Sequence, residues 1–229
     1  MQTKEKVKSG WGYVLLALLI FLLLGMDAFS GFVVGPILDG RSLSDPDMLF
    51  NNWYARAGVN LFSTILWVIS VLLVVRWAKR RGVLSELLGS RFDSQALLFF
   101  GLGVIVLIVI LRSGAPNGSV WLRFVSEYHG FEQQYPGYGM GVTVMQHIYY
   151  IAESAMVVLS LAAWQRAGEV WTDKTAIPWG GVGLALTWGL AHGVWGLLPS
   201  LLLGVIFVGA RKNALLTLVA VLTIFVVFS

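Results

Sequence analysis

The 229-residue chain contains no cysteine. This absence excludes disulfide bonds, thiolate metal sites and cysteine catalysis. Charge is also scarce: charged residues make up 12% of the chain and hydrophobic residues 57%, whereas a soluble domain usually has about twice that share of charge. The composition therefore predicts a protein that is surrounded mainly by lipid.

Long apolar runs fill most of the chain. A helix needs about 20 apolar residues to cross a bilayer of about 30 Å, so six or seven spans fit and a separate soluble domain does not. We expect an all-α, polytopic transmembrane helix bundle that forms a single domain over residues 1–229. The first run is too long for a signal peptide and is expected to be a retained span. The predicted spans are residues 11–35, 56–76, 95–112, 140–165, 178–197, 198–210 and 213–228.

The sixth span is short, so we expect it either to be tilted or to be joined to the fifth through a turn at Leu198-Pro199-Ser200. Basic residues predict the orientation of the bundle. With the amino terminus inside, twelve Lys and Arg residues fall on inner segments and four on outer segments (Arg41, Arg56, Arg112 and Arg123).

This distribution follows the positive-inside rule. It predicts a multi-pass protein of the bacterial inner (plasma) membrane with a cytoplasmic amino terminus and an outer carboxyl terminus. The net charge of +4 is then explained by the cytoplasmic loops. We therefore expect membrane lipids as partners and no nucleic acid.

Residues 120–131, between the third and fourth spans, show an amphipathic pattern. Apolar residues recur at helical spacing, with polar residues on the opposite side. This pattern predicts a helix on the outer leaflet, and ordinary packing against the bundle is the alternative. The apolar positions are Trp121, Phe124, Val125 and Tyr128, and the polar ones are Arg123, Ser126 and Glu127.

Three titratable residues, His147, Glu153 and His192, lie in the middles of apolar runs. Ionisable groups inside membrane spans are costly and mark functional sites more often than structural ones. In the fourth span, Gln146 and Tyr150 share one helical face with Glu153, because three- and four-residue spacings return to the same face. Tyr149 flanks that face, and His147 is offset from it by about a third of a turn.

In the fifth span, His192 lies beside a stripe of small residues, Ala185, Gly189 and Gly193, which permits close helix approach. Trp188 and Trp195 lie about one turn before and after His192. The residues expected to contact a substrate are therefore Gln146, Tyr149, Tyr150, Trp188 and Trp195.

The depths of these residues also agree. At 1.5 Å per residue, both His147 and His192 lie roughly 10 Å below the outer boundary, and Glu153 lies about 9 Å deeper. We therefore expect the three side chains to line one internal polar cavity. Nearer the outer side, Asp27 and Arg56 on adjacent spans are expected to form a structural ion pair.

Four interpretations of this cluster are open. Glu153 pairs with a histidine or tyrosine and fixes the helix register; or Glu153 and a histidine perform acid–base chemistry on water; or the two histidines hold a metal or haem; or the residues belong to a transport or binding pathway. Acid–base chemistry is preferred, because a buried carboxylate suits general-base work on water. A metal is disfavoured, since zinc needs a third or fourth ligand and only Glu153 is available. No metal and no cofactor are therefore expected.

Residues 140–229 resemble the CPBP (CAAX protease and bacteriocin-processing, or Abi) family of helical intramembrane proteases. The family pattern is EExxxR on one helix, FxxxH on a later helix and a further His followed by Asn. The stretch AESAMVVLSLAAWQRAGEVW is similar to the first helix, and WGLAH at residues 188–192 is similar to FxxxH. The 39 residues from Glu153 to His192 and the following LLLGVIFVGARKN also fit.

The chain departs from the pattern at three places. Ser154 and Val158 stand where the second glutamate and the arginine would be, and the last span has no histidine. The resemblance implies a metal-independent glutamate-type peptidase acting near the bilayer on a peptide or membrane-protein substrate. Glu153 would activate water, and His192, with His147 in place of the missing histidine, would stabilise the oxyanion. The alternative is a non-catalytic protein that binds a peptide, lipid or partner protein in the same cavity.

Overall fold

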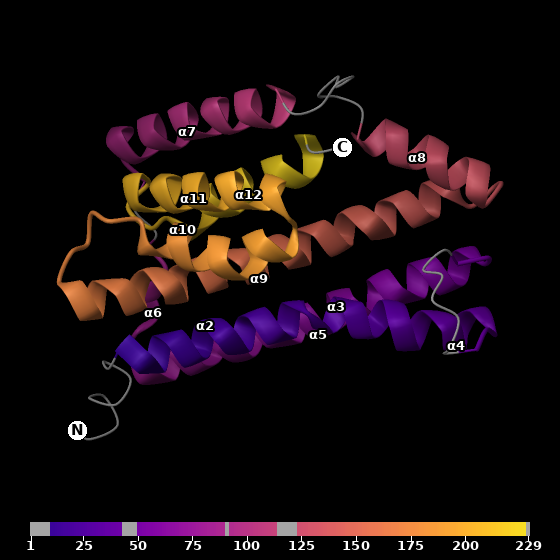
Figure 1. Ribbon diagram of the computed structural model, residues 1–229, viewed down its shortest axis with the longest axis horizontal. Helices are drawn as coiled ribbons and strands as arrows, with labels where there is room; N and C mark the ends of the chain where they lie inside the picture. The colour runs from indigo at the N-terminus through magenta and orange to yellow at the C-terminus, as the bar shows by residue number, and fades with distance from the viewer. Residues whose placement is uncertain (1–9, 43–49, 90–91, 114–122, 228–229) are drawn as a thin grey trace.

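The computed structural model describes residues 10–42, 50–89, 92–113 and 123–227 (Figure 1). Apart from one isolated bridge between Gly89 and Asn213, the regular structure of these residues is helical. The elements are α2 (Gly10–Leu24), α3 (Met26–Phe29), the π-helix η1 (Ser30–Val34), α4 (Gly35–Asp39), α5 (Trp53–Arg81), α6 (Leu84–Leu87), α7 (Ser94–Ser113), α8 (Arg123–Gln134), α9 (Gly139–Thr172), α10 (Trp179–Leu184), the π-helix η2 (Ala185–Gly189), α11 (Val194–Gly209) and α12 (Ala214–Val227).

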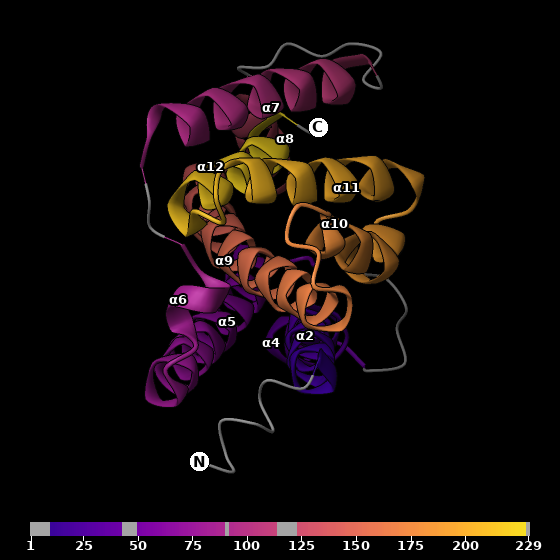
Figure 2. The same cartoon turned by 90° about the vertical axis from the view of Figure 1, so that its left-hand side faces the viewer.

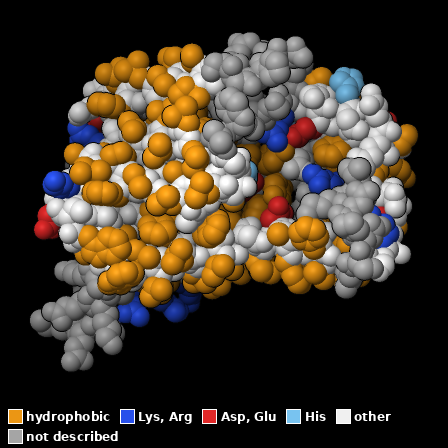
Figure 3. Space-filling view, viewed as in Figure 1, with side chains coloured by type: hydrophobic (Ala, Val, Ile, Leu, Met, Phe, Trp, Pro, Cys, Tyr) orange, Lys and Arg blue, Asp and Glu red, His pale blue; other side chains and the backbone are white. Residues whose placement is uncertain are grey.

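Three helical segments of the described chain are long and apolar enough to cross a membrane. They are Gly10–Asp39, Trp53–Arg81 and Gly139–Thr172, and shorter apolar helices cover Ser94–Ile110, Gly196–Gly209 and Ala214–Phe225. Large apolar side chains such as Leu15 and Leu72 are more than 60% exposed, and orange side chains cover much of the face in Figure 3. Soluble monomers rarely expose such broad apolar surface. The all-α fold is therefore confirmed and a multi-pass membrane protein is supported, whereas the count of seven spans and the orientation stay predictions.

Helix α9 forms the centre of the bundle. It packs against α2 and α5 on one side and against α10 and α12 on the other, with α8 along its amino-terminal half. Figures 1 and 2 show these two groups of helices separated by α9, with α7 beyond α11 and α12. Its 34 residues span about 51 Å at 1.5 Å per residue. Helices from both the amino-terminal and the carboxyl-terminal parts of the chain therefore contact α9.

Carboxylate side chains bind backbone N–H groups at the starts of the long helices α5 and α9. At the start of α9, the Glu132 carboxylate accepts the backbone N–H groups of Gly137 (2.7 Å) and Gly139 (3.0 Å). At the start of α5, Asp39 accepts the N–H groups of Asn51 and Asn52, each at 2.9 Å. The Gly139 N–H is the first of α9 and lacks a partner within the helix, so Glu132 stabilises that start. Asp39 instead holds the two residues directly before α5.

Helices α10 and α11 form a hairpin whose turn differs from the predicted one. The first arm continues from α10 through η2 to Ala191, and the chain then turns at His192 and Gly193. Pro199 lies inside α11, so the turn predicted at Leu198-Pro199-Ser200 is wrong. Gly193 has φ 70° and ψ −162°, a conformation open mainly to glycine, whereas a proline near a helix start removes only one N–H donor.

The hairpin is held together by close backbone contact between glycines. A Cβ atom on Gly189 would lie 2.8 Å from Ser200 Oγ and 3.1 Å from the carbonyl oxygen of Gly196. Gly181 approaches Gly204 in the same way, because a Cβ atom on Gly181 would lie 2.9 Å from the Gly204 Cα atom. The predicted close approach at Gly189 is confirmed, and α11 is the helix that makes it.

Candidate functional site

A cavity of about 610 Å³ lies between the two groups of helices that flank α9. Figure 3 shows this face of the molecule hollowed, with acidic and basic side-chain atoms at the hollow. Residues of α2, α3, α5, α8, α9, α11, α12 and the end of the first hairpin arm line it: Phe21, Leu24, Gly25, Asp27, Ala28, Trp67, Arg123, Gln146, Tyr149, Tyr150, Glu153, Trp188, Ala191, His192, Gly196, Pro199, Ile224 and Phe225.

Glu153 and His192 both line this cavity, and Trp188 connects them. The indole Nε1–H of Trp188 donates to Glu153 Oε1 at 3.2 Å, and the Trp188 and His192 rings lie 4.2 Å apart between centroids. Only 6% of the Glu153 surface is exposed. A carboxylate from α9 and an imidazole from the tip of the hairpin thus open to one cavity, beside the middle of α9.

The ring of His192 is oriented by its own helix. Its Nδ1 lies 2.8 Å from the carbonyl oxygen of Trp188. Because a carbonyl oxygen can only accept, Nδ1 carries the hydrogen. Among the described residues, Nε2 has no hydrogen-bond partner and is available to a ligand or water. In the protonated ring both nitrogens would donate.

Three residues of α9 that were expected to contact a substrate, Gln146, Tyr149 and Tyr150, also line the cavity. Gln146 accepts hydrogen bonds from Arg56 Nη2 and Asn60 Nδ2, each at 2.9 Å. Tyr149 interacts electrostatically with Glu153 and packs against Trp67 with centroids 4.8 Å apart. The side chain of Trp195 lies outside the described part of the structure.

His147 lies apart from Glu153 and His192. Its ring packs against Phe124 of α8 (centroids 4.8 Å apart), and its Nδ1 lies 3.6 Å from Glu127 Oε2. It does not belong to the cavity lining. The offset of about a third of a turn from the Glu153 face, visible in the sequence, is enough to direct it toward α8 instead.

Asp27 is a cavity residue that the sequence interpretation missed. It lies in α3, directly before the π-helix η1, and accepts a hydrogen bond from Ser63 Oγ at 3.2 Å. The expected ion pair with Arg56 is wrong, because Arg56 donates to Gln146 and Asp27 faces the cavity. Asp27 and Glu153 are near enough to interact electrostatically. Its position inside an apolar run was the signal that identified the other site residues.

Helix α8 covers the site beside the amino-terminal half of α9. The predicted amphipathic helix at residues 120–131 is observed at Arg123–Gln134. Arg123 donates to Glu127 Oε1 (2.8 Å) and to the Tyr150 hydroxyl oxygen (2.7 Å), and that hydroxyl donates to Glu127 Oε1 at 2.6 Å. The polar face of α8 therefore binds α9, so packing on the bundle is the interpretation that the structure favours.

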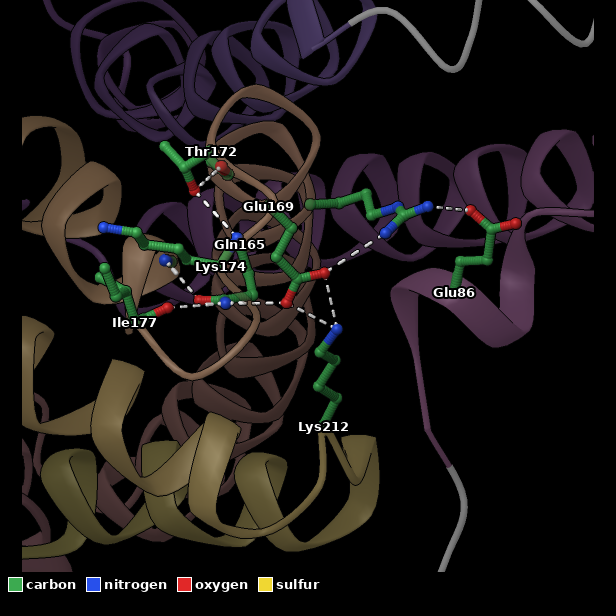
Figure 4. A network of polar contacts seen from close by, with 10 residues as sticks. Glu86, Gln165, Glu169, Thr172, Lys174, Ile177 and Lys212 are labelled. Carbon is green, nitrogen blue, oxygen red and sulfur yellow. Dashed lines mark hydrogen bonds and ion pairs between the residues drawn. The ribbon is translucent and has the colours of Figure 1, made fainter.

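A second polar cluster, at the carboxyl-terminal end of α9, was also missed by the sequence interpretation. Glu169 is 3% exposed and binds Lys212 Nζ at 2.6 Å, Arg166 Nη1 at 3.4 Å and Gln165 Nε2 at 2.9 Å. Arg166 also binds Glu86 at 2.7 Å. Figure 4 shows these contacts joining α6, α9 and the turn between α11 and α12.

The donor set does not favour a metal ion. Among the described residues, no group of three or more His, Asp or Glu side chains is placed to hold one.

The two positions at which the CPBP pattern has a second glutamate and an arginine are buried and do not belong to the cavity lining. Ser154 donates to the Tyr150 carbonyl oxygen at 2.7 Å, and Val158 is 4% exposed.

Comparisons with protein-family models, curated proteins and solved structures find no match to this chain. The CPBP resemblance therefore depends on the motif residues alone.

Proposed function

We propose that the protein is a membrane-embedded hydrolase of the CPBP-like type, which cleaves a peptide bond in the cavity with Glu153 as general base. The observation that carries the proposal is that Glu153 and His192 open to one cavity without binding each other. Space between a carboxylate and an imidazole is what a water molecule and a carbonyl group need.

In the proposed reaction, Glu153 removes a proton from water and the hydroxide attacks the carbonyl carbon of the substrate. Protonated His192 donates through Nε2 to the tetrahedral oxyanion, while Nδ1–H remains on the Trp188 carbonyl oxygen. When the carbon–nitrogen bond breaks, the proton held by Glu153 moves to the leaving amine. The atoms balance, and the scheme needs no cofactor.

The alternative is a non-catalytic protein that binds a peptide, lipid or partner protein in the same cavity. The alternative is favoured by the residues that stand where the CPBP pattern has its second glutamate and its last histidine. Ile224 and Phe225 of the last helix line the cavity, and a serine stands beside Glu153. A relative that has lost catalysis would show the same replacements.

Glu153→Gln distinguishes the two functions. It keeps the size and hydrogen-bonding capacity of the side chain and removes the base, so we expect hydrolysis to be lost while expression and the free energy of unfolding stay near wild type. The assay incubates purified protein in proteoliposomes with a library of membrane-anchored peptides in ¹⁸O-water. Mass spectrometry then detects new carboxyl termini that carry one ¹⁸O atom.

Glu86→Gln is the matched control, since it makes the same chemical change at an ion pair outside the cavity. It should retain hydrolysis. If wild type and Glu153→Gln produce the same labelled termini, Glu153 is not the base. If wild type produces none, the binding function replaces the enzymatic one. A loss of stability of about 1.5–3 kcal/mol in Glu153→Gln, the cost of a lost charge-assisted hydrogen bond, would indicate a structural role.

A further inference from the structure

We infer that the group held in this cavity carries a positively charged nitrogen, as a quaternary ammonium or a protonated amine does. The inference rests on the proposed function only in taking the cavity as the binding site of the protein. It adds the chemical class of the ligand, which neither the motif residues nor the proposed reaction specifies.

Aromatic rings from four elements converge on the cavity. Trp67 of α5 packs against Tyr149 of α9. Tyr150 stacks on Phe225 of α12 with centroids 5.0 Å apart, and Trp188 of η2 meets the same Phe225 ring at 6.2 Å. An apolar core uses aromatic rings as well, but these rings line open space. The faces of such rings attract cations, and aromatic cages are a common way to bind quaternary ammonium groups.

Two carboxylates lie among these rings and line the cavity. Asp27 comes from α3 and accepts hydrogen bonds from Ser63 and Tyr149, and Glu153 comes from α9 and accepts one from Trp188. Within the part of the chain that the structure describes, neither forms an ion pair with a basic side chain. A bound cation would supply the missing positive charge, and buried carboxylates are rarely left without one.

The basic side chains near the cavity have partners of their own. Arg123 lines the cavity and lies over the Tyr150 ring, and its guanidinium binds Glu127 at 2.8 Å and the Tyr150 hydroxyl oxygen at 2.7 Å. Arg56 donates to Gln146 and lies over the Phe131 ring. Because Glu127 matches the charge of Arg123, the described lining holds two further carboxylates, Asp27 and Glu153, against the single imidazole of His192.

The first test compares choline with 3,3-dimethyl-1-butanol, which has the same shape without the charge. Binding is measured by titration calorimetry on the full chain in a maltoside detergent, because phosphocholine detergents would compete. We expect choline to bind at least about tenfold more tightly than the neutral alcohol, since charge and aromatic faces both favour it. Equal binding of the two, or no binding of choline, would overturn the inference.

Asp27→Asn should weaken choline binding about tenfold while leaving the binding of the neutral alcohol unchanged. Asp173→Asn is the matched control, because Asp173 lies exposed at the far end of α9, and it should bind choline as wild type does. If both variants bind choline like wild type, Asp27 has no part in the site and the inference fails.

The second test does not need a ligand and uses the absence of cysteine. Ala191→Cys places a thiol on the cavity lining, and Gly141→Cys places one at an exposed position of α9 with open space around it. Each is treated with methanethiosulfonates that carry a trimethylammonium or a sulfonate group. Negative clefts concentrate cations about 10-fold or more, so the rate ratio of cationic to anionic reagent should be about tenfold higher at Ala191→Cys.

Adding Asp27→Asn to Ala191→Cys should lower that ratio toward the value at Gly141→Cys. An equal or lower ratio at Ala191→Cys would contradict the inference even if Asp27→Asn failed to fold. Failure of the proposed hydrolysis is distinguishable, because choline binding and thiol modification are measured without turnover. Cation preference without hydrolysis supports the inference alone, and hydrolysis without cation preference supports only the proposed function.

Discussion

Trp188 is the residue on which the geometry of the site depends most. Its indole donates to Glu153, its backbone carbonyl accepts from His192, and its ring packs against the imidazole. It lies in a π-helix, an irregularity that is often found at functional sites. One side chain therefore orients both groups that the proposed reaction uses.

Trp188→Phe keeps an aromatic ring beside His192 and removes the donor to Glu153. We expect a loss of about 1.5–3 kcal/mol in the free energy of unfolding, because the hydrogen bond reaches a carboxylate. The measurement is a denaturing-detergent titration of Trp188→Phe, Glu153→Met and the double variant. The coupling between the two changes should equal most of this loss, and fully additive effects would show that the hydrogen bond contributes nothing.

At the scale of helices, the hairpin of α10, η2 and α11 lines one side of the cavity. The first arm, Trp179–Ala191, is about 20 Å long and α11 is about 24 Å long at 1.5 Å per residue. Both arms are shorter than the apolar thickness of about 30 Å. The hydrogen bond from Trp188 places the tip of the hairpin beside the middle of α9. The space beyond the tip is therefore left to the cavity.

Gly193→Ala tests the turn that places this tip. Alanine is strained at φ 70° and ψ −162°, so we expect a loss of about 1–3 kcal/mol in the free energy of unfolding. Gly101→Ala is the control, because Gly101 lies within α7 with no atom within 4 Å of an added Cβ. A Gly193→Ala protein as stable as Gly101→Ala would contradict the observed turn.

The Glu169 cluster joins α6, the carboxyl-terminal end of α9 and the turn between α11 and α12. Glu169→Gln leaves the Lys212 ammonium without its buried partner, and breaking a buried ion pair costs about 3–5 kcal/mol. The expected result is an equally large loss of unfolding free energy. Replacing both residues, with Glu169→Gln and Lys212→Met, should recover part of it. A double variant less stable than Glu169→Gln would show that Lys212 is stabilised by other contacts.

At the scale of the whole molecule, α9 joins two groups of helices that enclose the cavity between them. The orientation of this bundle in the membrane is predicted from the basic residues. Reporter fusions after Arg81, Gly118, Lys174 and Ser229 should lie inside, outside, inside and outside. If the hairpin of α10, η2 and α11 enters the membrane from the cytoplasmic side and returns to that side, the expected locations of the four reporters do not change. A cytoplasmic reporter at Ser229 would refute it.

Much of the fold follows from the sequence by itself. Runs of apolar residues lengthen into helices wherever glycine and proline do not end them, because in lipid every backbone donor needs a partner within the helix. The amphipathic helix before α9 and the shared face of Gln146, Tyr150 and Glu153 follow from helical periodicity in the same way. Periodicity reports which face a residue occupies, and nothing about the helix that covers that face.

Only the tertiary structure decided which residues meet. Asp27 and Glu153 are 126 positions apart in the chain, and the packing of α2, α3 and α5 on α9 brings both to one cavity. His147, six positions before Glu153, faces α8 instead. The turn at Gly193 and the buried partners of Glu169 also depend on contacts between distant segments. Local preferences determine helices in this protein, whereas side-chain packing between helices determines the site.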